Sequence, residues 1–315
     1  MNGAPRLIAL LVCGACGEPA APASEVVVAD ATLGGAPPVV ISATSGAVMW
    51  TASPAAGMTL VGGASVATLP AQGQELATAS GPVAPAGGYV VFAATGRISR
   101  VTLGGMPERI VATTPEALGG NAAVPPVSAW TSGAVVSWGV DSEEMMATLN
   151  RVDSCDHARV TSHDIYVAAI GNGERRLVRI DQTTAAVMGV TSSSTWADMF
   201  PGGGTAGATY AGRIVDADDH GALWLVEETP TKRGLLIDAP AQGQAAVLLQ
   251  HLQGATGLFA SPDALYWQEG QELLTAPRAG GAASIVASLP GAAGAFADGY
   301  IYFVNGNAIE RMHVE

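Results

Sequence analysis

The chain has 315 residues, of which 40 are glycine and 19 are proline, while only 13% are charged. This composition is typical of a loop-rich β protein large enough for one all-β domain, and it argues against a helical bundle. The formal net charge of −13, without a cluster of Lys and Arg, argues against a nucleic-acid partner, because binding along phosphates requires clustered positive side chains.

The N-terminus has the features of a secretory signal. Arg6 supplies a positive charge, and residues 7–12 form an apolar run that is too short to span a bilayer, which takes about 20 residues. The segment Cys13-Gly14-Ala15-Cys16 resembles the lipobox of bacterial lipoproteins, with Cys16 as the lipidated residue. It departs from that pattern because Cys13 stands where the lipobox usually has Leu.

The lipobox resemblance implies three parts for the chain. Residues 1–15 would be the signal peptide of a lipoprotein, residues 16–24 the lipidated Cys and a flexible tether, and residues 25–315 a single domain in the cell envelope. A plain cleaved signal peptide and a cytoplasmic chain are the alternatives. After cleavage and lipidation, Cys155 is the one thiol left, so we expect no disulfide framework.

A turn followed by a short apolar run with an aromatic residue recurs seven times. The small or acidic residues that precede these runs stand at positions 46, 88, 133, 164, 221, 263 and 299, so the spacings are 42, 45, 31, 57, 42 and 36. Most spacings are close to the roughly 40–45 residues of a four-stranded propeller blade. The repeats therefore predict an all-β fold, a β-propeller of seven four-stranded blades.

The two ends of the chain predict how the ring closes. The last copy ends with the chain and lacks an outer strand, whereas residues 25–32 read as a strand without partners. We expect this N-terminal strand to close the last blade, because unpaired edges invite aggregation. The 57-residue interval is too long for one blade, so residues 192–209 are expected to form an inserted loop. Rings of six or eight blades are the alternatives.

The repeat units resemble those of bacterial YWTD-type and NHL-type propeller lipoproteins. In these families an aromatic pair on the second strand is followed by a strand that ends in a Gly-Gly turn, as in Tyr266-Trp267 and Arg278-Ala279-Gly280-Gly281. No copy has an intact Tyr-Trp-Thr-Asp motif, and Met49-Trp50-Thr51-Ala52 is the nearest. Residues 44–50 also resemble the quinoprotein-like repeats of outer-membrane assembly propellers. Both resemblances imply the propeller fold.

Asp216, Asp218 and His220 are the candidate metal ligands. Alternating oxygen side chains that end in a glycine resemble the start of a calcium loop, which makes calcium the cofactor to test. However, His220 is a poor ligand for a hard cation, and acidic residues followed by glycine open most copies of the repeat. We therefore favour a structural turn. No motif for nucleophilic catalysis is present, and we predict no catalytic residue.

The tryptophans fall into two groups, one expected to pack between blades and one expected to contact a partner. Four of them recur at one position of the repeat and are expected to pack between blades: Trp50, Trp138, Trp224 and Trp267. Trp196 lies in the expected inserted loop together with Met199 and Phe200, and these three are the candidates for an exposed partner contact.

Two functions are consistent with these patterns. The first is a non-enzymatic, lipid-anchored binding or scaffold module for an envelope protein or a glycan. The alternative is an extracytoplasmic propeller enzyme, a metal-assisted lyase or lactonase that uses the axial channel. Propellers host both functions, so the fold cannot decide between them.

Overall fold

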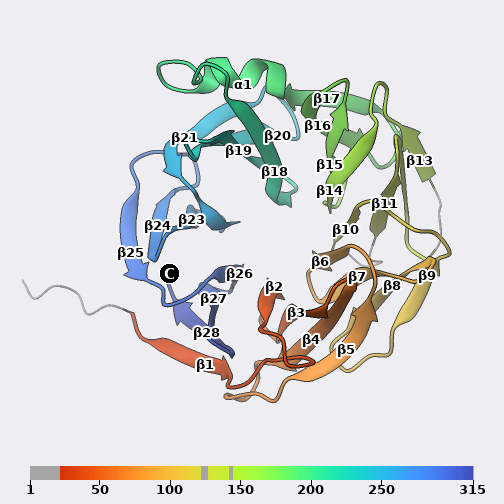
Figure 1. Cartoon of the computed structure of the whole chain (residues 1–315), viewed down its shortest axis with the longest axis vertical. Helices are drawn as coiled ribbons and strands as arrows, with labels where there is room; N and C mark the ends of the chain where they lie inside the picture. Colours follow the sequence, from red (N-terminus) through yellow and green to blue (C-terminus); the bar gives the residue numbers. More distant parts are fainter. Residues whose placement is uncertain (1–21, 122–126, 142–144, 315) are drawn as a thin grey trace, which may run out of the picture.

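A computed structural model describes residues 22–121, 127–141 and 145–314. These residues form seven four-stranded antiparallel sheets arranged as blades in a ring (Figure 1). The prediction of a seven-bladed propeller is confirmed, and the six- and eight-bladed alternatives are wrong. In the described part of the chain no helix is long and apolar enough to cross a bilayer. The predicted signal peptide and Cys16 lie outside the described residues.

The blades are numbered in the order in which the chain forms them. Blade 1 contains β2 (Val39–Ala43), β3 (Ala47–Ala55), β4 (Met58–Ser65) and β5 (Gln74–Ala79). Blade 2 contains β6 (Val83–Ala86), β7 (Tyr89–Ala94), β8 (Arg97–Thr102) and β9 (Glu108–Val111). Blade 3 contains β10 (Leu118–Gly120), β11 (Ser128–Ser132), β12 (Val135–Gly139) and β13 (Met145–Thr148).

The remaining blades follow the same order. Blade 4 contains β14 (Ser154–Val160), β15 (Asp164–Gly171), β16 (Glu174–Asp181) and β17 (Val187–Ser192), and blade 5 contains β18 (Thr209–Asp218), β19 (Gly221–Thr229), β20 (Arg233–Pro240) and β21 (Ala246–Gln253). Blade 6 contains β22 (Thr256–Ala260), β23 (Ala264–Glu269), β24 (Glu272–Pro277) and β25 (Ser284–Ser288). Blade 7 contains β26 (Ala293–Ala297), β27 (Tyr300–Asn305), β28 (Ala308–His313) and β1 (Ser24–Val28).

The N-terminal strand closes the ring as predicted. β1 pairs antiparallel with β28, so that Glu25 lies opposite Arg311. Arg311 donates from Nε to Glu25 Oε2 at 2.8 Å, and the buried side chains of Val27 and Val28 join the core. The outermost strand of blade 7 therefore comes from the N-terminal end of the chain, whereas its other three strands come from the C-terminal end (Figure 1).

The repeated aromatic runs form the second strands of six blades and supply the core between blades. In blade 3 the expectation is wrong: Trp138 lies on the third strand, β12, and Trp130 on β11 takes the second-strand place. Trp50 on β3 is fully buried and belongs to a cluster that includes Tyr302 of blade 7. It lies opposite Gly62 on β4, where an added Cβ would come within 2.5 Å of the indole ring. A glycine is required there because the flat indole occupies the space of a side chain.

The innermost strands of neighbouring blades pack closely against one another. Gly294 on β26 packs so closely against β2 that a Cβ atom would collide with the carbonyl oxygen of Val40. Hydrogen bonds also link neighbouring blades here, because Tyr89 donates to the carbonyl of Asn121 at 2.6 Å, and the Asn121 amide donates to the carbonyl of Thr161 at 2.7 Å. This close packing fixes the side chains that face the axis.

Candidate functional site

The segment expected to be an inserted loop contains a short helix. Among the described residues, α1 (Ser193–Met199) is the single helix, and it lies at the outer rim beside β17 (Figure 1). Trp196 is fully buried, with its ring 5.9 Å from that of Trp224, and its Nε1 donates to Thr191 Oγ1 at 3.0 Å. The expectation of an exposed Trp196 is therefore wrong, because burying the indole against blade 5 removes a large apolar area from water.

Phe200 is also buried, so it too is not the exposed contact that the sequence suggested. The Arg233 guanidinium lies over its ring at 5.2 Å, and Arg233 Nε donates to Glu228 Oε2 at 2.9 Å. The Glu228 carboxylate also accepts hydrogen bonds from Thr205 and Thr231. These partners, Arg233 first, lower the pKa of Glu228 to about 2, so the segment after α1 is held against blade 5 by a charged carboxylate.

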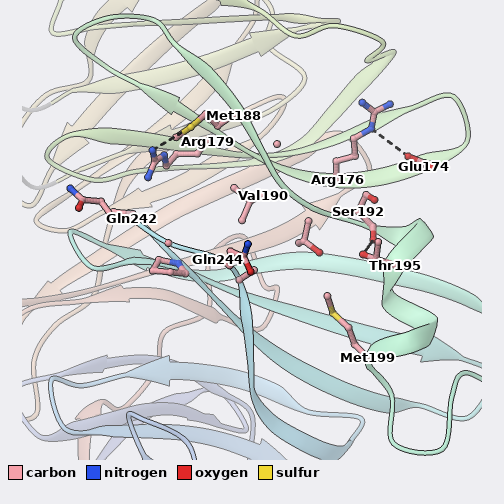
Figure 2. Close-up of a pocket in the computed structure, with 16 residues that line it drawn as sticks. Glu174, Arg176, Arg179, Met188, Val190, Ser192, Thr195, Met199, Gln242 and Gln244 are labelled. Carbon is pink, nitrogen blue, oxygen red and sulfur yellow. Dashed lines mark hydrogen bonds and ion pairs between the residues drawn. The ribbon is translucent and has the colours of Figure 1, made fainter.

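A groove lies between blades 4 and 5, next to α1. Its volume is about 860 Å³, and it separates β17 from the turn between β20 and β21 (Figure 2). We call it the inter-blade groove. Its walls consist of Glu174, Arg176, Arg179, Met188, Gly189, Val190, Thr191, Ser192, Thr195, Met199, Pro240, Ala241, Gln242, Gly243, Gln244 and Ala245. Of the three predicted contact residues, only Met199 is half-buried and lines this groove.

The inter-blade groove combines apolar and hydrogen-bonding side chains. Met188 is 46% exposed, and Arg179 Nη2 lies 3.8 Å from its sulfur. Arg176 Nε lies 3.8 Å from Glu174 Oε2 on the same wall. The exposed side chains of Gln242 and Gln244 stand on the opposite wall (Figure 2). Methionine adapts its shape to irregular partners, whereas guanidinium and amide groups give directional hydrogen bonds.

One wall of the groove is a sheet edge. β17 is the outermost strand of blade 4, paired on its inner side with β16 in a register that places Met188 opposite Arg179. Within the described residues no strand pairs with its outer side. Such an edge presents backbone donors and acceptors to another extended chain. The repeat pattern does not reveal this groove, because its walls come from segments about fifty residues apart that only the ring brings together.

The structure does not bring the three candidate metal ligands together as a site. Asp218 Oδ1 accepts hydrogen bonds from the backbone of His220 at 2.9 Å and of Gly221 at 3.3 Å, and its Oδ2 lies 3.0 Å from Arg278 Nη2. Asp218 thus stabilises the turn before β19 through its hydrogen bonds to the backbone. Asp216 instead lines a cavity on the axis of the ring. Among the described residues no group of three or more His, Cys, Asp or Glu side chains is placed to hold a metal ion. Calcium stays a prediction of the sequence.

A second cavity, of about 330 Å³, lies on the axis where the innermost strands end. We call it the axial cavity. Residues from all seven blades line it, among them Asp216 from β18 and Arg159 from β14. The sequence pattern singled out Asp216 for another reason and did not single out Arg159.

Comparison with known proteins supports the fold. No family model matches the chain, and no curated protein matches its sequence. Virginiamycin B lyase from Staphylococcus aureus is similar in structure, with a TM-score of 0.61 at 13% identity, over 93% of this chain and 99% of the lyase. Oligogalacturonate lyase from Vibrio parahaemolyticus has a TM-score of 0.58 at 8% identity, over 94% of this chain and 97% of that chain.

A third solved structure, a protein from Lactobacillus plantarum, has a TM-score of 0.52 at 13% identity and covers 81% of this chain and 85% of its own. At such low identities the likeness establishes the propeller fold alone. It does not extend to a YWTD or NHL subfamily. A metal-assisted lyase or lactonase stays an alternative predicted from the sequence, since a fold hosts several chemistries.

Proposed function

We propose that the chain is a non-catalytic, extracytoplasmic binding module whose inter-blade groove receives an extended segment of a partner protein. The proposed lipid on Cys16 holds it in the cell envelope. One observation carries this proposal: the outer edge of β17, which has no strand partner among the described residues, forms a wall of an 860 Å³ groove.

Strand addition explains why an edge and a groove occur together. An extended segment that pairs with β17 gains affinity from main-chain hydrogen bonds, and its alternate side chains fill the space on either side. Apolar side chains of the segment would contact Met188 and Val190, while polar ones would reach Gln242 and Gln244 across the groove. A glycan offers hydroxyl groups but lacks the backbone ladder, so a protein partner matches this groove better.

The hydrogen-bonding groups of the groove favour a segment whose side chains accept hydrogen bonds, such as carboxylates and amides. Arg176 and Arg179 lie on the β17 wall, where Glu174 is the single lining carboxylate. Guanidinium groups bind carboxylates and amides with directional hydrogen bonds. Each arginine also has a carboxylate nearby, since Glu174 Oε2 lies 3.8 Å from Arg176 Nε and Asp164 Oδ1 lies 3.7 Å from Arg179 Nε. Directional hydrogen bonds, rather than net positive charge, are therefore what the arginines offer a bound segment.

Photo-crosslinking from inside the groove tests this proposal. A photoreactive amino acid replaces Met188 in the lipidated full-length protein in its native envelope. The control carries the same group at Ile285, which is 62% exposed on β25, the outermost strand of blade 6. Position 188 should crosslink to one defined segment of one envelope protein, and position 285 should not. Identical products from both positions, or no protein product from 188, would contradict the proposal.

A further inference from the structure

The axial cavity is walled mainly by small and apolar residues. Phe259 of β22 and Phe296 of β26 are half-buried and line it, and the ring of Phe296 stacks on Tyr266 at 5.4 Å. Pro85, Gly120 and other small residues complete the wall. Its 330 Å³ volume is at the lower end of the range of small-molecule sites, about 300–1,000 Å³, so a large substrate does not fit inside.

Two opposite charges face this cavity from neighbouring blades. Arg159 Nη1 donates to its neighbour's carbonyl, Ala158 O, at 3.3 Å, and Asp216 Oδ1 accepts from the adjacent backbone nitrogen of Ala217 at 2.9 Å. Within the described residues, no ion pair joins Arg159 to Asp216 or joins either of them to a third side chain. Both charges therefore retain hydrogen-bonding capacity toward the cavity.

Local backbone geometry places the carboxylate there. The register of β18 against β19 shifts between Ile214 and Asp216, which marks a β-bulge. A bulge re-aims the side chains that follow it, and such bulges occur often beside binding sites. Burial raises the pKa of Asp216 and lowers the pKa of Arg159, and the attraction between these two charges opposes both shifts without cancelling them.

We propose that the axial cavity binds a small zwitterion, a molecule that carries one carboxylate and one cationic nitrogen, such as an amino acid or a betaine. The ligand carboxylate pairs with the guanidinium of Arg159, and the cationic nitrogen pairs with the carboxylate of Asp216. The two phenylalanines face the hydrocarbon part and the cationic nitrogen, which aromatic rings attract. This site is separate from the inter-blade groove and goes beyond the proposed function.

A ligand with a single charge fits less well. A simple carboxylate would be attracted by Arg159 but repelled by Asp216. A simple ammonium ion would be attracted by Asp216 but repelled by Arg159. In a cavity of low dielectric constant, both attraction and repulsion act more strongly than in water. A zwitterion neutralises both of these half-buried charges at once, so it is the class of ligand that this pair selects.

Isothermal titration calorimetry on the purified full-length protein tests the inference. The probes are the twenty amino acids, β-alanine, γ-aminobutyrate and glycine betaine, with acetate and methylammonium as single-charge controls. At least one zwitterion should bind with a Kd below about 1 mM and at least tenfold more tightly than either control. Failure of every zwitterion to bind at 10 mM, or equally tight binding of acetate, overturns the inference.

Charge-removing variants locate the site. Asp216→Asn keeps the shape of the side chain and should weaken the best zwitterion at least tenfold while improving acetate binding, because the repulsive carboxylate is gone. Arg159→Met should abolish zwitterion binding. Asp263→Asn, at an exposed turn of blade 6, is the matched control and should leave the Kd unchanged. Unchanged zwitterion affinity in a folded Asp216→Asn protein overturns the assignment.

Discussion

Glu228 carries a buried charge at the base of the segment that follows α1. Its pKa is held at about 2, below its ordinary value of 4.5, mainly by the hydrogen bonds from Arg233. The charged form therefore stabilises the fold fully above pH 4.5, and this contribution is lost as the pH falls toward 2. The sign of this pH dependence follows from the lowered pKa alone.

We expect Glu228→Gln to destabilise the protein most at neutral pH. The variant cannot pair with Arg233 as a charge, so its free energy of unfolding should fall below that of the unmodified protein at pH 7. The two curves should converge as the pH falls through 2 and below, where the native carboxyl becomes protonated. Urea unfolding at a series of pH values measures this, and a difference that is independent of pH would contradict the assignment.

Cys155 has a buried thiol rather than a reactive one. Its side chain lies 3.6 Å from the carbonyl of Gly133, and burial, the largest cause, raises the pKa of the thiol to about 12. The nucleophilic thiolate is thus scarce at neutral pH. In a full-length protein with Cys13→Ser and Cys16→Ser, a thiol reagent at pH 8 should label Cys155 only after unfolding in urea. Labelling of the native protein within minutes would show that the site is open.

At the scale of elements, Trp196 explains why a seven-residue helix forms at all. α1 has no side-chain hydrogen bond at its N-cap, and its N-cap is Ser192. A helix this short is marginal by itself, so its stability comes from packing. The indole of Trp196 supplies that packing against Trp224 and thereby positions one end of the inter-blade groove.

Truncating the Trp196 side chain should therefore destabilise this region strongly. Trp196→Ala removes a buried ring and should lower the free energy of unfolding by about 3–5 kcal/mol. Met199→Ala, in the same helix but half-buried, is the matched control and should cause a smaller loss. Chemical denaturation measures both. Equal losses in the two variants would mean that Trp196 does not anchor α1.

The sequence predicted the blades well because each one repeats the same local pattern. An aromatic run after a turn became the second strand in six of the seven blades, with Trp50 and Trp267 among its buried side chains. In blade 3 the run became the third strand, β12, because β11 with Trp130 takes the second place. The sequence did not predict α1, since residues 192–209 are rich in residues typical of loops and the helix depends on tertiary contacts. It also missed Arg159, because the direction of its side chain depends on the packing of the innermost strands.

At the scale of the whole molecule, closure by β1 ties the two ends of the chain together. β1 covers the outer edge of β28, and the Glu25 to Arg311 ion pair lies across this junction. Without β1 the last blade has three strands and an exposed edge that can pair with another chain. Closure is therefore expected to affect both stability and association.

Two truncations test the closure. A chain that begins at residue 24 keeps β1, whereas one that begins at residue 30 lacks it. The shorter chain should have a lower Tm and should self-associate in size-exclusion chromatography, and the longer chain should be monomeric with a higher Tm. If both chains share one Tm and one elution volume, β1 does not close the ring in solution.

The central claim is that a partner segment pairs with the edge of β17 inside the inter-blade groove. Gly189 lines this groove, and an added Cβ there meets no atom within 4 Å, so Gly189→Arg blocks the groove without strain. Gly46→Arg in blade 1 is equally unhindered and serves as the control. A synthetic peptide of the segment crosslinked from position 188 provides the ligand for both variants.

Titration calorimetry with that peptide is the most direct measurement. Gly189→Arg should weaken binding at least tenfold, which corresponds to about 1.4 kcal/mol, while Gly46→Arg should bind as tightly as the unmodified protein. Equal affinity for all three proteins would place the partner elsewhere on the propeller and would contradict the claim.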